Sequence, residues 1–250
     1  MDHPLFSIVT PNFNSGEKLI RTVESLDRQA VAYEHLVMDG QSTDGSLELS
    51  ASLAASRPRM HIHSEPDKGP YDGMNKGIRV ATGRYLYFIG AGDTLLPGVL
   101  KEVERRLPAD DLGFVYGDVI YKASRYDGAF DRLKLSRQNI CHQSIFYGGE
   151  VFRLCGEYSL LYPCAADWEM NLRCFANRSI AKDYIDLVVA NFEEGGISQF
   201  GDEHFDRDHL RLVRQYLGLR CYWHKKWPGV KLRLRRKTRM FAKRLLPGCR

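Results

Sequence analysis

The sequence lacks the features by which several protein classes are recognised. No apolar run approaches the roughly 18–20 residues that span a bilayer. The start, Met-Asp-His-Pro, has neither the basic flank nor the apolar stretch of a secretory signal. The six cysteines form no Cys-x-x-Cys pair, which disfavours a zinc site and fits reduced thiols. With 44% hydrophobic and 27% charged residues, the chain of 250 residues is expected to be a globular protein of the cytoplasm.

Two nucleotide-binding motifs are also missing. The chain contains no Gly-x-Gly-x-x-Gly and no Gly-x-x-x-x-Gly-Lys-Ser/Thr. These glycine-rich loops mark the common dinucleotide fold and the P-loop. Any nucleotide site in this protein is therefore expected to be of another kind.

Acidic residues are missing from the end of the chain. Residues 1–203 hold 21 Lys and Arg against 29 Asp and Glu, whereas 204–250 hold 15 against 2, and no Asp or Glu follows Arg220. The net charge thus changes from −8 in the first part to +13 in the second. The split predicts an acidic body over 1–203 and a basic tail over 204–250 that meets a polyanionic surface.

The first 90 residues alternate between short apolar runs and amphipathic stretches. Runs typical of buried strands occur at 5–10, 35–39, 60–63 and 85–89. Helical patterns begin near residue 16 and cover 43–56 and about 70–82, and Ser42 or Thr43 is expected to cap the second. Strands separated by such helices indicate βαβ units. The sequence therefore predicts an α/β fold with a mainly parallel central sheet.

Polar loops follow the ends of the predicted strands. Asn12, Asp39, Asp67 and Asp93 lie in four of these loops. Ligands of open α/β sheets bind outside the carboxyl ends of the strands, so these side chains are expected to share one crevice. Several carboxylates that face an anionic ligand imply a divalent cation between them. The pattern predicts a site for a phosphate- or nucleotide-type ligand.

Three sequence blocks at these loops resemble glycosyltransferase family 2. They are Ser7–Asn14, Val37–Gly45 and Ser64–Gly77, of which the last is the longest and most specific. The similarity is greatest to bacterial members that build exopolysaccharides such as colanic acid. It continues through blocks at 83–85, 90–93, 141–144, 167–169 and 195–198 and covers about residues 5–200.

The resemblance implies a glycosyltransferase-A catalytic domain over 1–203. It further implies an inverting, hexosyltransferase-type enzyme that uses a nucleotide-diphosphate sugar, with Mg2+ or Mn2+ as cofactor. The acceptor would be a glycan or lipid-linked glycan of bacterial cell-surface polysaccharide biosynthesis. Positions that match donor-binding residues are Pro11, Asn12, Asp39, Asp67, Lys68, Asn75, Lys76, Gly92 and Asp93. Positions on the acceptor or diphosphate side are His142, Gln143, Trp168, Gly195 and Gly196.

Two positions depart from the family's metal and nucleotide pattern. Asp93 matches the last acid of the Asp-x-Asp metal motif, but Ala91 stands at the first acid. Gly40 stands where many members carry a second acid after Asp39. One carboxylate can hold a divalent ion together with ligand phosphates, so Asp93 is the expected metal ligand. An inactive glycosyltransferase-like scaffold is the alternative that these departures leave open.

Asp167 matches the catalytic base of the family. The acceptor hydroxyl is a poor nucleophile, so a positioned carboxylate should take its proton. Asp167 is expected to begin a helix whose apolar stripe is Trp168, Leu172 and Phe175. A role for Asp167 as an N-cap, with Glu169 as the base, is the competing interpretation.

The basic tail has an amphipathic pattern of its own. From Val230, the apolar Leu234, Phe241 and Leu245 recur at helical spacing among Lys and Arg, and two tryptophans, at 223 and 227, precede them. Such a helix lies in a membrane interface, so we expect peripheral attachment to the inner face of the cytoplasmic membrane. The alternative is that the stripe packs on the catalytic domain or a second subunit. Nucleic acid is not expected as a partner, because no binding motif accompanies the tail and the acidic body would repel phosphate.

Overall fold

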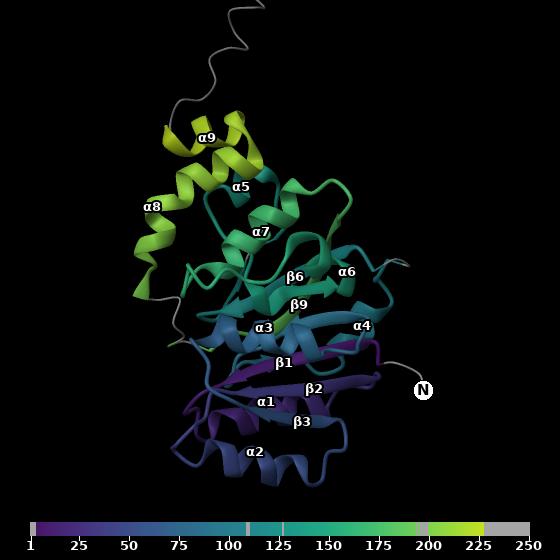
Figure 1. Cartoon of the computed structure of the whole chain (residues 1–250). Helices are drawn as coiled ribbons and strands as arrows, with labels where there is room; N and C mark the ends of the chain where they lie inside the picture. The colour runs from purple at the N-terminus through teal and green to yellow at the C-terminus, as the bar shows by residue number, and fades with distance from the viewer. Residues whose placement is uncertain (1–3, 109–110, 127, 194, 196–199, 228–250) are drawn as a thin grey trace, which may run out of the picture.

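The computed structural model describes residues 4–108, 111–126, 128–193, 195 and 200–227 (Figure 1). Its main feature is one curled sheet in the order β3-β2-β1-β4-β8-β6-β9-β5, with β7 paired to β6. The strands are β1 (Phe6–Asn12), β2 (Tyr33–Asp39), β3 (Met60–Ser64), β4 (Tyr85–Phe88), β5 (Thr94–Leu95), β6 (Gly113–Tyr121), β7 (Ser124–Tyr126), β8 (Ile145–Gly148) and β9 (Ala181–Asn191). The predicted α/β class is confirmed.

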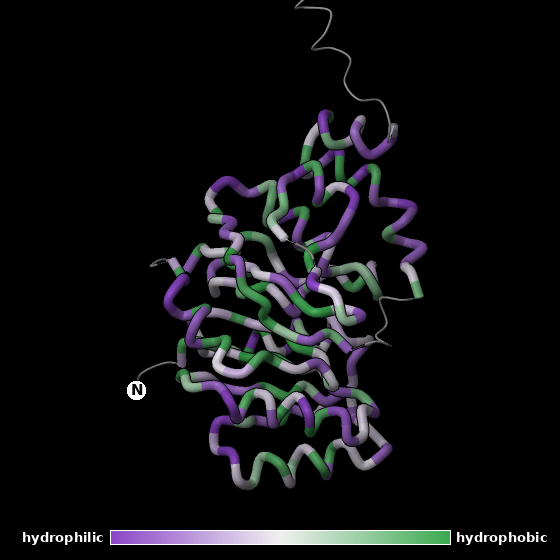
Figure 2. Tube along the Cα trace, turned by 180° about the vertical axis from the view of Figure 1, so that it is seen from behind, coloured by the Kyte–Doolittle hydropathy of each residue, from purple (hydrophilic) through white to green (hydrophobic). Residues whose placement is uncertain are grey.

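The helices cover both faces and one end of this sheet (Figure 1). They are α1 (Lys18–Asp27), α2 (Ser46–Ala54), α3 (Pro70–Val80), α4 (Val99–Glu104), α5 (Arg132–Leu135), α6 (Gly149–Cys155), α7 (Ala166–Ala176), α8 (Glu203–Leu212) and α9 (Leu219–Lys226), with short turns η1 (His142–Ser144) and η3 (Val213–Leu217). Hydrophobic residues concentrate in the central strands, and hydrophilic ones alternate with them along the outer helices (Figure 2). No helix among the described residues has the length and apolar character to cross a membrane.

The two halves of the sheet differ in strand direction. Strands β1 to β4 run parallel to one another, as the alternating pattern predicts. Strand β8 is antiparallel to both β4 and β6, β6 is parallel to β9, and β9 is antiparallel to β5. The sheet is therefore mixed, with its parallel part confined mostly to the half that the first 90 residues build.

Strand β1 runs two residues past the predicted run at 5–10, through Pro11 to Asn12. Pro11 pairs with Met38 of β2, and Asn12 pairs with Asp39. On its other side, β1 is paired to β4 only as far as Val9. Proline has no backbone N–H to donate. It is therefore tolerated on the side of a strand where no neighbouring strand would accept that hydrogen bond. The strand can therefore carry Asn12 to the carboxyl edge of the sheet.

Helix α2 begins later than predicted, and its predicted cap is wrong. The residue before its first turn is Gly45, in the left-handed conformation that glycine adopts most readily. The Ser42 hydroxyl instead donates to Asp39 at 2.6 Å. The Ser42 hydroxyl is therefore bonded to the Asp39 carboxylate at the end of β2 and does not cap α2.

Helix α3 lies unusually close to β1. A Cβ atom added at Gly77 would overlap the side chain of Val9, whose own side chain is fully buried. Glycine at this position lets the helix approach the sheet, and Tyr71 and Met74 on the same helix are buried against it. The start of α3 is thereby held beside the carboxyl edge of the strands.

The first part of the predicted basic tail packs against the rest of the protein. Phe205, Leu212, Val213, Leu217 and Cys221 are buried in the same hydrophobic cluster as residues of α3, β6 and α7. The predicted amphipathic helix from Val230 lies outside the described residues.

Candidate active site

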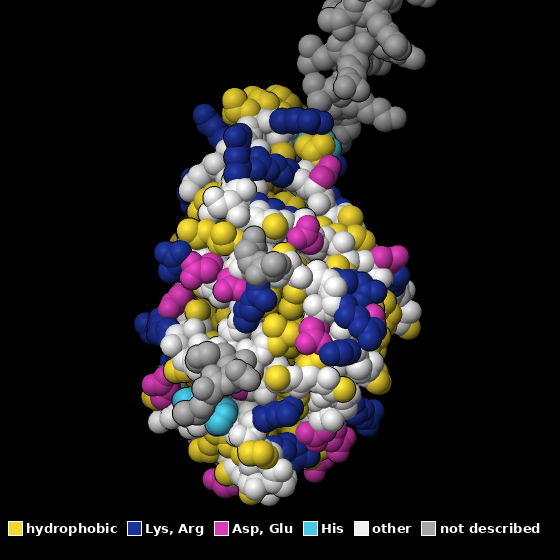
Figure 3. All heavy atoms as spheres, turned by 90° about the vertical axis from the view of Figure 1, so that its right-hand side faces the viewer, with side chains coloured by type: hydrophobic (Ala, Val, Ile, Leu, Met, Phe, Trp, Pro, Cys, Tyr) yellow, Lys and Arg dark blue, Asp and Glu magenta, His cyan; other side chains and the backbone are white. Residues whose placement is uncertain are grey.

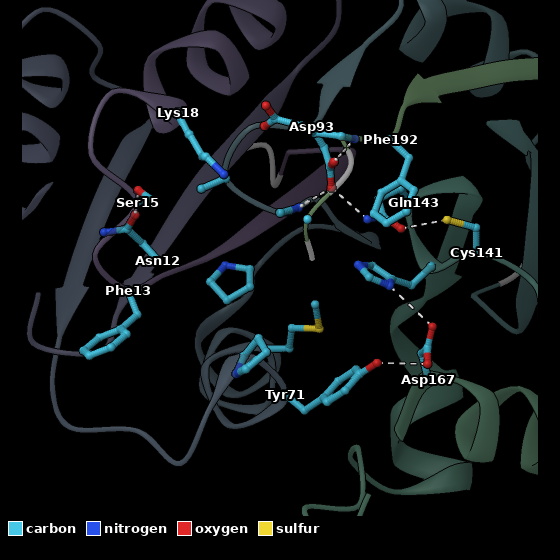
Figure 4. A pocket seen from close by; sticks show the side chains of 18 of the residues that line it. Asn12, Phe13, Ser15, Lys18, Tyr71, Asp93, Cys141, Gln143, Asp167 and Phe192 are labelled. Carbon is cyan, nitrogen blue, oxygen red and sulfur yellow. Dashed lines mark hydrogen bonds and ion pairs between the residues drawn. The ribbon is translucent and has the colours of Figure 1, made fainter. Parts of the chain in front are cut away.

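A cavity of about 780 Å3 lies at the carboxyl edge of β1 and β4. One wall comes from the segments after β1 and β3, and the opposite wall from β6, β7, η1, α7 and the segment after β9. Figure 4 shows Asn12 and Ser15 on the first wall, Asp167, Cys141 and Gln143 on the second, and Asp93 between them. The predicted site residues that line it are Pro11, Asn12, Asp67, Asp93, His142, Gln143, Asp167 and Gly195.

Asp39 lies behind the first wall and orients it. Its carboxylate accepts hydrogen bonds from Asn12 Nδ2 at 2.8 Å, from the Ser42 hydroxyl at 2.6 Å and from the Ser64 hydroxyl at 2.8 Å. Burial opposes its ionisation, but these bonds together outweigh burial and lower the pKa of Asp39. Asp39 therefore fixes the amide of Asn12, which faces the cavity, without lining the cavity itself.

We expect Asp39→Asn to lower the free energy of unfolding by about 2 kcal/mol at pH 7. The amide puts an NH2 group in place of an oxygen that accepts hydrogen bonds, so a donor loses its partner. The carboxylate stabilises the wild type above its unfolded pKa, near 3.9, and this contribution is lost as pH falls towards the lowered pKa of the folded state. Urea unfolding of both proteins at several pH values measures the difference. A gap that stayed constant down to pH 3 would contradict the assignment.

The space beside Gly40 is filled by another carboxylate. A Cβ atom at Gly40 would lie 2.7 Å from Asp67 Oδ2, and Asp67 Oδ1 accepts a bond from the Gly69 backbone at 2.9 Å. A larger residue at position 40 would displace the Asp67 side chain. The wall therefore carries an acid at this place although the sequence has none directly after Asp39.

Asp93 is buried at the back of the cavity. Its carboxylate accepts hydrogen bonds from Gln143 Nε2 at 2.7 Å, from the backbone N–H of Glu193 at 2.8 Å and from that of Gly90 at 3.3 Å. Burial outweighs these bonds and raises the pKa of Asp93. The Cys141 thiol donates to Gln143 Oε1 at 2.8 Å and thus fixes which end of the Gln143 amide faces Asp93. The chain therefore binds the Asp93 carboxylate from three sides.

The surroundings of Asp93 fit a cation held by one protein carboxylate. A carboxylate offers about four lone-pair sites, and three are used, so about one remains for a metal. No group of three or more His, Cys, Asp or Glu side chains that could hold a metal occurs in the described part of the chain. Magnesium commonly rests on one or two carboxylates together with substrate phosphates and water. Asp93 suits that arrangement and not a cage of protein ligands.

Asp167 faces the cavity from the first turn of α7. The Tyr71 hydroxyl donates to Asp167 Oδ1 at 2.9 Å, and Asn139 Nδ2 donates to Oδ2 at 2.9 Å. Burial, with the nearby Asp167 charge second, raises the pKa of Tyr71 well above its usual value, so Tyr71 stays a donor. His142 Nδ1 lies 3.4 Å from Oδ2. These contacts hold a carboxylate at the cavity surface with its orientation defined.

Two observations bear on the competing interpretations, in which Asp167 is only an N-cap and Glu169 is the base. Position 165 is the N-cap of α7, and its side chain makes no capping bond, so Asp167 is not the cap. Glu169 does not line the cavity; it is buried and paired with Arg173 at 2.8 Å. The Arg173 guanidinium also donates to the backbone of Glu157 at 2.7 Å. Glu169 is therefore paired away from the cavity, whereas Asp167, although also hydrogen-bonded, lines it.

The remaining predicted site residues lie away from the cavity. Asn75 is buried and exchanges two hydrogen bonds of 2.9 Å with the backbone of Tyr158. Lys76 Nζ donates to the Pro66 carbonyl at 2.5 Å. The Trp168 indole donates to the Leu135 carbonyl at 2.9 Å.

Lys68 and three glycines complete the predicted set. Lys68 and Gly92 do not line the cavity. The Gly92 N–H donates to the Thr22 hydroxyl at 2.9 Å. Gly195 lines the cavity with φ of 101°, in the region that favours glycine, and Gly196 lies outside the described residues.

Several cavity residues were not predicted. Tyr71 lies inside the block at 64–77, so the sequence carried a signal for it, whereas Asn139 lies outside every matched block. Tyr121, Tyr126 and Phe192 line the second wall, and the Tyr121 and Phe192 rings lie 5.2 Å apart. These aromatic residues come from β6, β7 and the segment after β9, whose pairing only the structure shows.

Comparison with known sequences gives one consistent result. Residues 7–159 match the model of Glycosyl transferase family 2. The chain is 37% identical over 242 residues to a PGL/p-HBAD biosynthesis glycosyltransferase of Mycobacterium bovis, which covers 92% of this chain and 93% of the relative. It is 32% identical over 182 residues to an uncharacterized glycosyltransferase of Mycobacterium tuberculosis, which covers 68% of each chain.

Solved structures with low sequence identity share the fold. S. aureus TarS 1-349 in complex with UDP-GlcNAc superposes with a TM-score of 0.66 at 14% identity, over 85% of this chain and 66% of that chain. The mannosyltransferase PcManGT from Pyrobaculum calidifontis in complex with GDP-Man and Mn2+ superposes with a TM-score of 0.63 at 16% identity, over 87% and 63%. At this identity the likeness shows the fold alone.

Proposed function

Because this chain belongs to glycosyltransferase family 2 and has a glycosyltransferase-A fold, we propose that its cavity binds a nucleotide-diphosphate sugar and passes the sugar to an acceptor hydroxyl with inversion at the sugar carbon. The observation that carries the proposal is the position of Asp167. It faces, across one cavity, the wall that Asp39 orients through Asn12. A donor and an acceptor can therefore meet beside a fixed carboxylate.

The first wall is the proposed donor side. Asn12 and Asp67 offer polar groups there, and Lys18 lines the cavity from the first turn of α1 (Figure 4). The two solved neighbours hold UDP-GlcNAc and GDP-Man, which are both nucleoside-diphosphate sugars. A lysine near the leaving diphosphate would stabilise the negative charge that develops on it. Donor binding by this wall is thus the first step of the proposed reaction.

The proposed chemical step is a single displacement. An acceptor oxygen forms a bond to the anomeric carbon while the bond from that carbon to the diphosphate breaks, and the electron pair leaves with the nucleoside diphosphate. The hydroxyl proton passes to the Asp167 carboxylate. Tyr71 and Asn139 keep that carboxylate oriented, and general base catalysis contributes about 100- to 10,000-fold. One displacement from the face opposite the leaving group inverts the configuration.

We propose Mg2+ or Mn2+ as cofactor, held by Asp93. When bound, the ion supplies positive charge that offsets the charge of the diphosphate. The residues of this chain set its place, since Gln143 and the backbone at Gly90 and Glu193 fix the carboxylate. Support comes from the fit of Asp93 to a single-carboxylate site.

The second wall is the proposed acceptor side. Tyr121, Tyr126 and Phe192 give it an aromatic surface beside His142 and Asp167. Aromatic rings pack well against apolar faces such as those of sugar rings. We therefore propose a glycan or lipid-linked glycan as acceptor, in the biosynthesis of a cell-surface polysaccharide or glycolipid. His142 would contact this acceptor, since it lines the cavity 3.4 Å from the base.

An inactive scaffold is the second candidate, and Ala91 is the observation that favours it, since it removes one acid of the metal motif. The two candidates differ in one measurable property. An enzyme turns over its donor, by transfer or slowly by hydrolysis to water, whereas a scaffold does not. Release of nucleoside diphosphate from the matching donor decides between them.

A thermal-shift screen tests the proposal directly. We expect one nucleoside diphosphate and its sugars, at about 100 times their Kd, to stabilise the protein by roughly 2.7 kcal/mol, which corresponds to about 5–10 °C in Tm. Mg2+ or Mn2+ should increase the shift. The control is His63→Ala, since His63 does not line the cavity; the nucleotide should raise the Tm of this variant as much as that of the wild type. If no uridine, guanosine, adenosine, cytidine or thymidine diphosphate raises the Tm, the proposed donor site is wrong.

A further inference from the structure

Helix α9 presents an apolar stripe to solvent. Its buried side carries Cys221, which joins the main hydrophobic cluster. On the opposite side, Leu219 is 58% exposed, Trp223 is 44% exposed, and Trp227, directly after the helix, is 52% exposed. Leu219 and Trp223 are spaced four apart and share one helix face, which Trp227 extends beyond the helix end; these three residues are the α9 stripe. The Trp223 and Trp227 rings stack at 4.6 Å with 8° between their planes. The three residues thus give α9 an exposed apolar surface.

Positive charge surrounds the α9 stripe. Lys226 Nζ lies 5.5 Å from the Trp223 ring and 5.6 Å from the Trp227 ring. Arg220 is exposed on the same helix. Figure 3 shows hydrophobic side chains beside Lys and Arg at the end of the molecule where α9 lies. From Arg220 onwards the chain contains no acid. The surface therefore combines indole rings with cations, and α9 itself carries no acid; Asp131 and Asp206 are the acids that act on it, at His224 and Lys225.

We propose that the α9 stripe docks the protein on an anionic membrane surface, with the indole rings at headgroup level and Arg220 and Lys226 on the lipid phosphates. Tryptophan prefers the interface because its ring is apolar and its N–H is polar. Lys and Arg are attracted to the negative surface potential of anionic lipid. The inference does not depend on the proposed sugar transfer.

Charge complementarity favours lipid over two other occupants. A second copy docked through the same stripe would bring the cations of both α9 helices together, Arg220, Lys225 and Lys226 of each, and like charges repel. A nucleic acid would use flat aromatic faces for its bases. Here the two indole faces already lie against each other, and Leu219 offers no ring. An apolar interface with phosphate above it satisfies all of these groups.

Docking through α9 would also fix the position of the cavity. Lys225 of the same helix lies 5.8 Å from the Trp168 ring, and Trp168 is the neighbour of Asp167 on α7. Arg137, two residues before Asn139, donates to the backbone of α9 at His224. The stripe and the second wall of the cavity therefore belong to one packed unit. A membrane-held protein would keep that wall at a constant height above the lipid.

Vesicle flotation of the full chain tests the proposal. The probes are vesicles of phosphatidylcholine and vesicles containing about one-third phosphatidylglycerol, at physiological salt. We expect binding to the anionic vesicles only, with a blue shift of tryptophan emission. Trp223→Ser/Trp227→Ser should lose most binding and the shift. Arg220→Gln/Lys226→Gln should bind about tenfold to thirtyfold more weakly.

Matched controls separate docking from general stickiness and misfolding. Leu160→Ser/Leu161→Ser removes two other exposed apolar residues, and Lys101→Gln/Arg105→Gln removes two cations of α4. Both should float like the wild type, and all variants should show the wild-type far-UV circular dichroism and Tm. No binding of the wild type, or equal binding of the Trp223→Ser/Trp227→Ser variant, would overturn the proposal. So would a dimer or a nucleic-acid complex that this variant abolishes while vesicle binding is absent.

Discussion

Asp167→Asn is expected to lower the rate of sugar transfer by about 100- to 10,000-fold, because it removes the base that takes the acceptor proton. The donor should still bind, since Asp167 lies on the wall opposite Asn12 (Figure 4). Either orientation of the variant amide brings its Nδ2 to a donor: to Asn139 Nδ2, which is fixed because Asn139 Oδ1 accepts a bond from Asn171 at 2.8 Å, or to the backbone N–H of Trp168. That conflict should cost about 1–3 kcal/mol of stability. Initial rates, with donor-induced thermal shifts, measure both effects.

The control for this variant is Glu169→Gln. It removes a nearby carboxylate of the same helix that is paired with Arg173 and does not line the cavity. We expect a lower Tm but a nearly unchanged rate per folded molecule. If Glu169→Gln were the variant that abolished transfer, while Asp167→Asn retained it, the base would have been assigned to the wrong residue.

Asp93→Asn is expected to reduce transfer by about 100- to 1,000-fold, the usual cost of removing one preorganised electrostatic group. The nucleotide-induced rise in Tm should persist in part, but its dependence on Mg2+ or Mn2+ should disappear. Burial raises the pKa of Asp93, so its charge is held in the fold at a cost, and the neutral amide removes that cost. The amide also turns its Nδ2 towards a donor, either Gln143 Nε2 or the backbone N–H of Glu193, so we expect a loss of about 1–3 kcal/mol of stability without unfolding. Wild-type transfer should likewise fall in acid as Asp93 takes up a proton at its raised pKa.

Asp118→Asn serves as the matched control for this second variant. Asp118 is also buried and accepts three bonds, from Gly128, Arg125 and Tyr184, but it does not line the cavity. Its loss should lower stability and leave the metal dependence intact. A wild-type response to metal in Asp93→Asn would show that Asp93 is not the ligand.

The sequence predicted the half of the fold that local pattern determines. The apolar runs near 6, 35, 60 and 85 became β1 to β4, because each is short, buried and followed by a polar loop. Ser42 was wrongly predicted as a cap although its partner is local: its hydroxyl donates to Asp39, three residues earlier, and α2 begins only after Gly45. The mixed second half was not predicted, since β8 and β9 find partners far away along the chain.

The same distinction explains which site residues were predicted. Matched blocks and their order pointed to Asn12, Asp93 and Asp167, all of which line the cavity. They could not separate Asn75, whose amide is bonded to Tyr158, from neighbours that face a ligand. A matched block predicts where a helix lies in the sequence. Whether one of its side chains faces the cavity depends on hydrogen bonds to residues far away along the chain. Asn139 was missed for this reason, because only folding brings it to Asp167.

The strand order has a consequence for biosynthesis. Strands β1 to β4 pair among themselves, so a ribosome that has released the first 90 residues has supplied nearly all of that layer. The free side of β4, with buried Tyr85 and Tyr87, must wait for β8, which begins at Ile145. At bacterial and eukaryotic elongation rates this wait lasts roughly three to eleven seconds. Thr94 of β5 waits longer still, for Asn191. We therefore expect the nascent chain to depend most on chaperones in this interval, when an apolar strand edge has formed before its cover exists.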